Sequence, residues 1–94
     1  MAPKDLKILT LLIDNPRGLY GSELVTLSNG YLSRGAIYTL LDRLVEKGFV
    51  REVEELPTPA LQMSRTRHFI TGAGQSAVRN YADEMGFLPK PMTI

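Results

Sequence analysis

The sequence predicts a mainly α-helical α+β fold in which three helices are followed by a small β-hairpin and a fourth helix. Three observations predict it: four segments carry apolar residues at helical spacing, two short segments before the last of them resemble strands, and glycine and proline mark the boundaries. The chain has 94 residues, which is the size of one domain with a modest core. We expect one domain over residues 1–85 and a C-terminal tail over residues 86–94.

The composition excludes several classes of protein. There is no cysteine and only one histidine, so disulfides and thiolate zinc sites are excluded, and a transition-metal site has almost no ligands. No stretch approaches the roughly 18–20 apolar residues of a membrane span. Asp5 and Lys7 stand where the apolar part of a signal peptide would begin. We therefore expect a cytoplasmic protein with no cofactor, no metal and no membrane association.

Two short helices are predicted in the first third of the chain, over residues 4–14 and 22–28. Pro3 suits the first position of the first helix, and the Asn-Pro-Arg-Gly run at 15–18 ends it. Gly21 or Ser22 can cap the second helix, and Asn29-Gly30 ends it with residues that tolerate a left-handed backbone. The apolar face of the first helix is Leu6, Leu9 and Ile13, widened by Ile8, Leu11 and Leu12, and that of the second is Leu24, Val25 and Leu27.

The third predicted helix, over residues 33–47, has the clearest pattern. Ser33 is a good N-cap, and Gly48 follows the helix as a C-terminal glycine. One apolar stripe runs along it at spacings of three and four: Ala36, Ile37, Leu40, Leu41, Leu44 and Val45. The opposite face carries Arg34, Tyr38, Thr39, Asp42, Arg43 and Glu46.

A hairpin and a last helix complete the predicted domain. Strands over residues 49–53 and 63–71 flank a polar connection that contains Pro57 and Pro59. Thr71 can cap a helix over residues 73–85, whose first turn Gly74 weakens. Two short helices, a tight turn, a longer helix and a hairpin give a winged helix-turn-helix, with the hairpin as the wing.

The exposed face of the third helix suggests binding to DNA. The N-terminal turn of a helix has a partial positive charge that favours phosphate. Arg34 and Tyr38 are four residues apart on one face, and arginine pairs bidentately with guanine or phosphate. Gly35 removes a side chain where another backbone has to approach closely. We therefore expect residues 33–47 to be a recognition helix in the major groove of double-stranded DNA.

The wing, residues 54–66 with the strand that follows, adds a second group of basic side chains. The net charge of +1 does not by itself support nucleic-acid binding. It does not exclude it either, because binding needs only a local basic patch. Between residues 65 and 79 there are three arginines and His68 and no acid. We expect this segment on the minor groove or the phosphates. The full set of predicted DNA contacts is Ser22, Ser33, Arg34, Gly35, Tyr38, Thr39, Arg43, Arg65, Thr66, Arg67 and His68.

Three blocks of the sequence resemble the PadR-like winged-helix transcriptional regulators, within the wider group that includes MarR-type repressors. They are Tyr20-Gly21 before Ser22-Glu23-Leu24, the run from Ser33 to Val50 with Gly35, Tyr38, Leu44 and Gly48 at the family spacing, and the run from Arg65 to Gly74. Family members usually carry a tyrosine where His68 stands. The resemblance implies a homodimeric DNA-binding repressor that reads a palindromic operator. We expect the dimer to form through the first and last helices, by faces such as Leu6/Leu9 and Val78/Tyr81/Met85.

Other interpretations of these residues stay open. Arg34 also fits a solvated helix start, and Tyr38 fits a core or dimer position. Arg65 and Arg67 also fit a solvated strand edge, and His68 fits a packed strand residue better than a ligand. A winged-helix module for protein–protein contacts is the main alternative function, suggested by the low net charge and the acidic Glu52-Glu54-Glu55 cluster. An enzyme is not expected, because no nucleophile with an oriented base and no carboxylate pair can be placed. A small-molecule effector between the domain and its dimer mate is a further open alternative, although no polar cluster in the sequence points to one.

Overall fold

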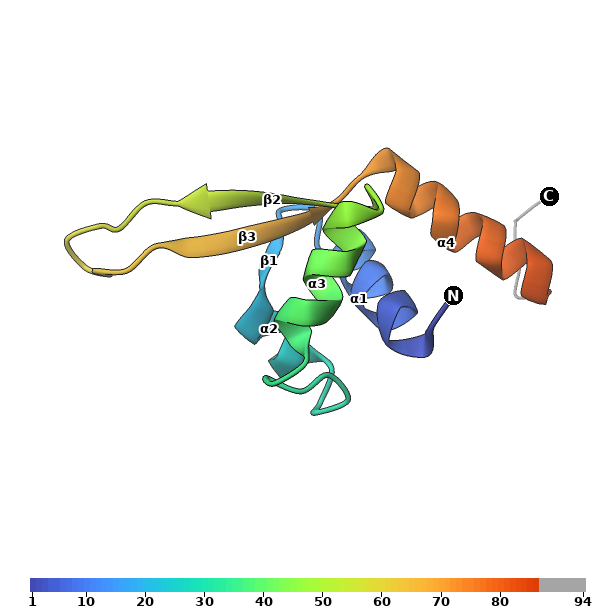
Figure 1. Ribbon diagram of the computed structural model, residues 1–94, viewed down its shortest axis with the longest axis horizontal. Coiled ribbons are helices and arrows are strands. Elements are labelled where there is room, and N and C mark those ends of the chain that lie inside the picture. The colour runs from blue at the N-terminus through green and yellow to red at the C-terminus, as the bar shows by residue number, and fades with distance from the viewer. Residues whose placement is uncertain (87–94) are drawn as a thin grey trace.

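A computed structural model describes residues 1–86, which form an elongated domain with a hairpin projecting at one end and a helix at the other (Figure 1). Within these residues, no helix is both long enough and apolar enough to cross a membrane. The elements in chain order are α1 (Pro3–Asp14), β1 (Leu19–Tyr20), α2 (Gly21–Leu27), α3 (Ile37–Glu46), β2 (Val50–Glu55), β3 (Arg65–Ile70) and α4 (Gly72–Met85).

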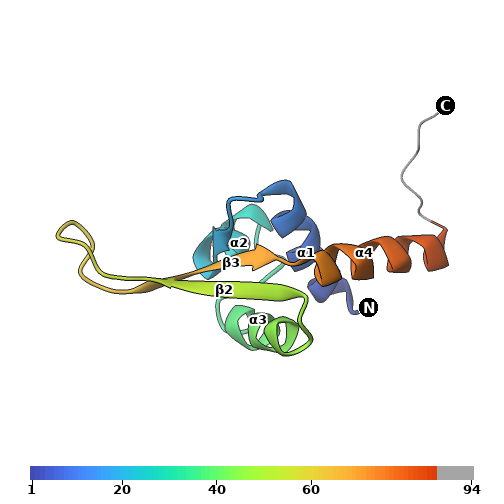
Figure 2. The same ribbon diagram turned by 90° about the horizontal axis from the view of Figure 1, so that it is seen from above.

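The sheet has three antiparallel strands, in the order β1-β3-β2. Strand β3 is central, and its registers place His68 opposite Leu19 on one side and Glu52 on the other. The sequence does not predict strand β1, because two residues are too few to show the alternation of apolar and polar side chains that identifies a strand. Its pairing matters for the architecture, since it attaches the hairpin to the segment that leads directly into α2. Only Val50 of β2 and His68 of β3 are buried, and the far end of the hairpin extends away from the body (Figure 2).

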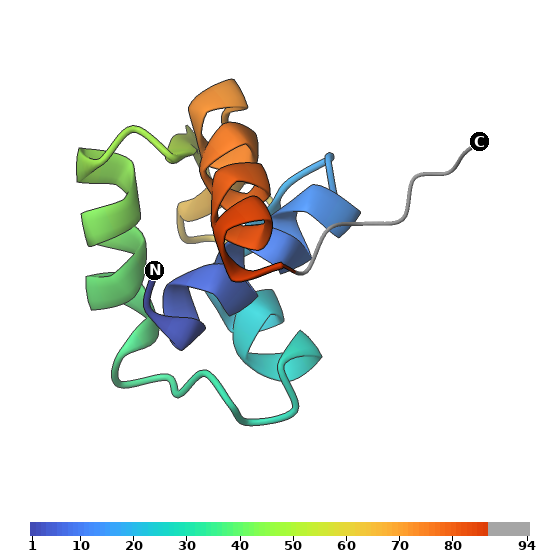
Figure 3. The same cartoon turned by 90° about the vertical axis from the view of Figure 1, so that its right-hand side faces the viewer.

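The core lies among α1, α2 and α3, each of which contacts the other two (Figure 3). The predicted stripe of α3 is confirmed: Ile37, Leu41 and Leu44 are buried. On α1 the buried face is centred on Ile8, Leu9 and Leu12, while Ile13 is exposed. The expectation that Leu9 contributes to a dimer face is therefore wrong, because its side chain is fully enclosed in the core.

The turn between α2 and α3 is anchored by a residue that the periodicity did not predict. Leu32 is fully buried although it lies in no helix. Its N–H donates to Ser28 Oγ at 2.9 Å, and that hydroxyl donates to the Val25 carbonyl at 2.8 Å. Asn29 and Gly30 have positive φ, as predicted for the end of α2. The segment that connects the two helices is therefore a fixed turn and not a loose loop.

Two predicted helix starts are corrected. The N-cap of α2 is Tyr20 rather than Gly21 or Ser22, and its N–H donates to the Glu23 carboxylate at 2.8 Å. Helix α3 begins at Ile37 instead of Ser33. Ser33 still accepts a hydrogen bond from the Ala36 N–H through its Oγ, at 3.2 Å, but this closes a turn before the helix. Ser33 therefore caps the turn that precedes α3, and not the helix itself.

The second half of the chain agrees with the prediction within a few residues. Gly48 has a φ of +81° after α3, and the Thr71 hydroxyl accepts from the Gly74 N–H at 3.0 Å at the start of α4. Both hairpin strands begin slightly later than expected, while β2 ends later and β3 ends earlier, so the connection runs from residue 56 to 64. Of the predicted tail over 86–94, residues 87–94 lie outside the described part of the chain.

Gly74 fixes how α4 meets the sheet. It is the only buried residue of α4, and a Cβ there would collide with the Phe49 carbonyl oxygen and lie 2.9 Å from Ile70 Cγ1. The same carbonyl accepts from the Thr71 N–H at 3.0 Å, so the backbone has little freedom to move away. Glycine is therefore required in the first turn of α4 by packing, although it weakens the helix.

We predict that Gly74→Ala lowers the free energy of unfolding by about 1–3 kcal/mol, the usual cost of overpacking, in spite of alanine's better helix propensity. Gly72→Ala is the matched control, because a Cβ there meets open space. The control should be neutral or stabilising by up to about 1 kcal/mol. Urea denaturation of both variants measures the difference. Equal stabilities would contradict the packing role of Gly74.

Candidate nucleic-acid interface

Tyr38 lies at the centre of the exposed surface that α3 forms with α2 and the hairpin. Its side chain is 55% exposed. Its ring nevertheless lies against α2, because a Cβ on Gly21 would come within 2.7–2.8 Å of the ring atoms and the hydroxyl oxygen. Gly21 thus leaves the space that the ring occupies at the start of α2. The result is an aromatic side chain that is fixed on one face and open to solvent on the other.

Two grooves meet at Tyr38. We call the first the wing groove: it has a volume of about 310 Å³ and separates α2 and α3 from the hairpin. We call the second the turn groove: it has a volume of about 180 Å³ and lies beside the turn that precedes α3. Ser22 and Tyr38 line both. The wing groove is otherwise lined by Tyr20, Gly21, Leu61, Met63, Ser64, Arg65 and Thr66, and the turn groove by Val25, Arg34 and Ile37.

The structure therefore brings together five of the residues predicted from the sequence as DNA contacts: Ser22, Arg34, Tyr38, Arg65 and Thr66. Arg34 is exposed in the turn before α3. The prediction that it lies within the helix is therefore wrong. Among the described residues, neither Arg34 nor Arg65 has a carboxylate at ion-pairing distance. The Arg65 guanidinium stacks 3.6 Å from the centroid of the Tyr20 ring, which holds it at the wing groove.

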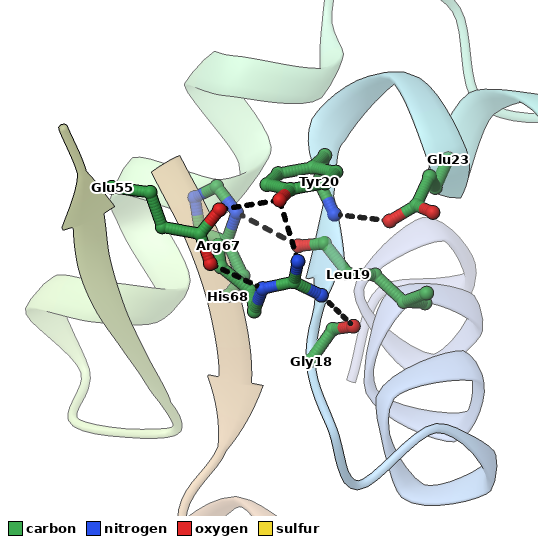
Figure 4. Close-up of polar contacts among 7 residues, drawn as sticks. All are labelled: Gly18, Leu19, Tyr20, Glu23, Glu55, Arg67 and His68. Carbon is green, nitrogen blue, oxygen red and sulfur yellow. Dashed lines mark hydrogen bonds and ion pairs between the residues drawn. The ribbon is translucent and has the colours of Figure 1, made fainter. Parts of the chain in front are cut away.

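Arg67 has a different role from Arg65, although both lie on the same side of β3 and both stack on Tyr20. Its Nε donates to Glu55 Oε2 at 2.7 Å, one terminal nitrogen donates to the Gly18 carbonyl at 3.2 Å, and the other donates to the Tyr20 hydroxyl (Figure 4). The Tyr20 hydroxyl in turn donates to the other oxygen of Glu55. We call these contacts the wing link, because they join β2, β3 and β1.

Electrostatics within the wing link keep all of its charges paired. The hydrogen bonds from Arg67 and then from Tyr20 lower the pKa of the Glu55 carboxyl. The hydrogen bond to Glu55 raises the pKa of Arg67, and the hydrogen bond to the same carboxylate raises the pKa of Tyr20. The positive charge of Arg67 is therefore neutralised inside the molecule. The predicted phosphate contact of Arg67 is not supported by this position, because its Nε and both of its terminal nitrogens already donate hydrogen bonds within the molecule.

His68 is a packed strand residue, which is the alternative to a DNA contact at this position. Its burial removes it from the predicted DNA contacts. It is 2% exposed, at the centre of the sheet. Its Nδ1 lies 3.4 Å from the Leu19 carbonyl and its Nε2 lies 3.6 Å from a Glu52 carboxylate oxygen. Burial lowers the pKa of His68, and this outweighs the Leu19 carbonyl and the carboxylates of Glu52 and Asp42, which raise it.

Arg43 is also separated from the grooves. It points toward the start of α1, where one of its terminal nitrogens lies 3.8 Å from Asp5 Oδ1. Asp5 is buried, and that oxygen has no hydrogen-bond partner among the described residues. Arg43 therefore compensates a buried carboxylate across the α1–α3 contact. Its predicted DNA contact is not supported by this position, even though half of its side chain is exposed.

The remaining predicted residues lie around the turn groove without lining it. Ser33 and Gly35 are exposed in the turn before α3, and Thr39 is exposed on the helix beside Tyr38. The Ser33 Oγ accepts from the Ala36 N–H, which leaves its own O–H free to donate. A Cβ on Gly35 would meet open space, so nothing within the described residues requires glycine there.

Sequence reasoning missed Tyr20, Glu55, Leu61 and Met63. The alternation of Arg65 and Arg67 with acids across the hairpin was a usable signal, since cross-strand neighbours of opposite charge commonly pair. Nothing in the sequence indicated that Tyr20 stacks beneath both arginines. Within residues 1–86, no three His, Cys, Asp or Glu side chains gather in a way that would hold a metal ion.

Comparisons with known proteins find similarity at the level of structure. No protein-family model matches the chain, and a search of curated protein sequences finds no match. A proposed transcriptional regulator from Thermoplasma acidophilum superposes with a TM-score of 0.72 at 27% identity, over 88% of this chain and 80% of that chain. A PadR-like transcriptional regulator from Bacillus cereus gives a TM-score of 0.70 at 23% identity, over 88% and 81% of the two chains.

A third solved structure, Bacillus subtilis PadR in complex with operator DNA, gives a TM-score of 0.73 at 19% identity. The chain has the winged-helix fold of PadR-like regulators. In this winged-helix fold α2 and α3 form the helix-turn-helix, and β2 and β3 form the wing. The match covers 100% of this chain and 53% of the B. subtilis PadR, so this chain spans about half the length of that protein.

Arg65→Ala and Arg67→Ala form a matched pair of variants on neighbouring positions of one strand face. Arg67→Ala removes the donors of the wing link, so we predict a lower urea midpoint. Arg65→Ala removes a stacked but otherwise unpaired cation, so we predict a nearly unchanged midpoint and a salt dependence of duplex affinity that is shallower by about one unit. Denaturation and fluorescence anisotropy measure the two effects. A stability loss in the Arg65 variant alone would reverse these assignments.

The buried His68 predicts a pH dependence of stability. Because its pKa in the folded chain lies below the unfolded value of 6.5, stability is full above that value and falls as the pH drops toward the folded pKa. One proton limits the slope to about 1.4 kcal/mol per pH unit. Urea midpoints at about pH 7.5 and about pH 5.5 should differ more for the natural chain than for His68→Gln. An equal pH dependence in the variant would remove His68 as its source.

Proposed function

We propose that this protein is a sequence-specific DNA-binding transcriptional regulator of the PadR-like family, within the wider MarR-type winged-helix group. The observation that carries the proposal is the convergence of Arg34, Tyr38 and Arg65 on two adjoining grooves at the exposed end of α3. The likeness to a PadR that has been crystallised with operator DNA, and to a PadR-like regulator, supports it. So does the resemblance of the three sequence blocks.

Each group at the grooves has a defined task in the proposed complex. Helix α3 enters the major groove. Arg34, in the turn just before the helix, pairs with guanine or phosphate, and the Tyr38 hydroxyl donates a hydrogen bond to a phosphate. Ser22 and Thr66 offer hydroxyls to the backbone on either side of Tyr38. Arg65, held on Tyr20, meets the phosphates that border the next minor groove. Arg67 fixes the hairpin at the angle that this arrangement needs.

We further propose that the protein acts as a homodimer, as a repressor on a palindromic operator. A groove of about 230 Å³ runs between α1 and α4 and is mainly apolar, and it is lined by Ile13, Gln75, Val78, Arg79 and Ala82. Met85 is exposed farther along α4, where that helix leaves the body (Figure 1). A second copy packed against this face would cover these side chains. Two recognition helices about 34 Å apart would then reach half-sites one DNA turn apart.

Selection of duplexes from a random pool by the purified protein, followed by sequencing, tests the proposal. We expect a palindromic consensus. Arg34→Ala should bind the selected duplex about 10- to 100-fold more weakly, because a bidentate arginine–base pair contributes about 1–3 kcal/mol. Its thermal stability should be unchanged. Arg17→Ala, which removes an exposed arginine from the turn after α1 and outside both grooves, is the control for net charge.

The possible outcomes separate the parts of the proposal. A consensus with no symmetry would contradict the palindromic dimer and keep the DNA-binding function. Equal affinity of the Arg34 and natural chains for the selected duplex would remove Arg34 from recognition. Failure to retain any duplex or heparin at low salt would favour the protein–protein module instead, because nonspecific binding through phosphates is the least that a DNA-binding domain shows.

A further inference from the structure

The wing tip, residues 56–64, has a composition that is unusual for a segment expected to approach DNA. It contains no charged residue, and its sequence is Leu-Pro-Thr-Pro-Ala-Leu-Gln-Met-Ser. The arginines of the hairpin begin only at Arg65, at the base of the tip. Phosphate contacts depend on cationic side chains and on hydrogen-bond donors. This tip therefore has no cation and only neutral donors, such as Gln62 and Ser64, with which to bind phosphate.

The tip instead presents apolar side chains to solvent. Leu56 is 78% exposed and Met63 is 65% exposed, which are the two highest values among the exposed large hydrophobic residues of the described chain. They stand on opposite arms of the hairpin, just beyond the ends of β2 and β3. Exposed apolar side chains gathered in one place commonly mark a contact with a partner.

The backbone of the tip is closed by a tight turn. The Thr58 N–H donates to the Leu61 carbonyl at 2.8 Å, and the Leu61 N–H donates back to the Thr58 carbonyl at 3.1 Å and to its Oγ1 at 3.0 Å. Pro59 lies inside this turn and fixes one of its φ angles. Leu56 and Met63 thus flank a hydrogen-bonded turn, and the restriction of that turn lowers the entropy cost of placing the tip against a partner.

The apolar tip is continuous with the surface proposed to bind DNA. Leu61 and Met63 line the same wing groove as Tyr38 and Arg65. A duplex that contacts Tyr38 and Arg65 therefore also lies against the tip. Along this surface the chemistry changes from guanidinium and hydroxyl groups near α3 to alkyl and thioether groups at the end of the wing.

We propose that the wing tip inserts Leu56 and Met63 into the minor groove as an apolar wedge, while Arg65 holds the bordering phosphates. This inference rests on the proposed function. Leucine, methionine and proline are among the side chains that unstack base steps from the minor groove and kink the duplex. Flexible pyrimidine–purine steps are kinked at the lowest cost, so the tip selects such steps by deformability and without hydrogen bonds to bases.

The double variant Leu56→Ser/Met63→Ser tests the wedge, with Gln62→Ser as the matched control on the same tip. The probe is the duplex selected by the natural chain, with 2-aminopurine placed at the flanking steps. We expect the double variant to bind about tenfold more weakly, with an unchanged salt slope and without the rise in 2-aminopurine fluorescence that reports unstacking. The control should stay within twofold. Circular dichroism checks folding, which these exposed positions should not affect.

Each other outcome overturns the wedge in a recognisable way. If the double variant matches the natural chain in affinity and fluorescence, the tip does not enter the groove while the proposed function stands. If it loses self-association in ultracentrifugation and keeps its duplex affinity, the tip contacts a protein. If the salt slope falls by about one unit, the tip acts through phosphates. If the natural chain selects no duplex at all, the proposed function fails and the wedge fails with it.

Discussion

The wing link joins the two halves of the candidate interface, and its centre is the guanidinium of Arg67. Through it β3 reaches Glu55 of β2 and the Gly18 carbonyl and the Tyr20 hydroxyl of the segment that enters α2. Besides these contacts, the short pairing with β1, the buried His68 of β3 and the buried end of β2 fix the hairpin relative to the helices. The wing groove exists because this angle is fixed. The proposed interface is therefore one surface rather than a helix and a loose wing.

A chain with a net charge of +1 can still present a basic surface, because some of its arginines are paired with carboxylates and others are not. Arg67 is neutralised by Glu55, and Arg43 lies beside the buried Asp5, so these cations serve the fold. Arg34 and Arg65 have no such partner among the described residues and border the grooves around Tyr38. Local availability of charge, and not the total, determines what the surface attracts.

The sequence predicted the helices and the hairpin because their signals are local. The apolar stripe of α3, the positive φ at Gly48 and the Thr71 cap each depend on residues within a few positions of one another. Strand β1 and the wing link could not be predicted in this way, since Arg67 contacts Gly18 across 49 positions of the chain. A string of serine, threonine, arginine and histidine residues resembled an exposed phosphate-binding segment. Within it Arg67 and His68 have structural roles, because long-range contacts decide which side chains stay free.

Amide hydrogen exchange, with and without the selected duplex, tests most directly whether α3 and the wing act as one surface. Exchange that slows together in residues 33–39 and in the wing, residues 54–66, with no change along α1, is the result that this account predicts. Slowing confined to α3, with the wing unchanged, would contradict it, as would protection confined to the α1–α4 face.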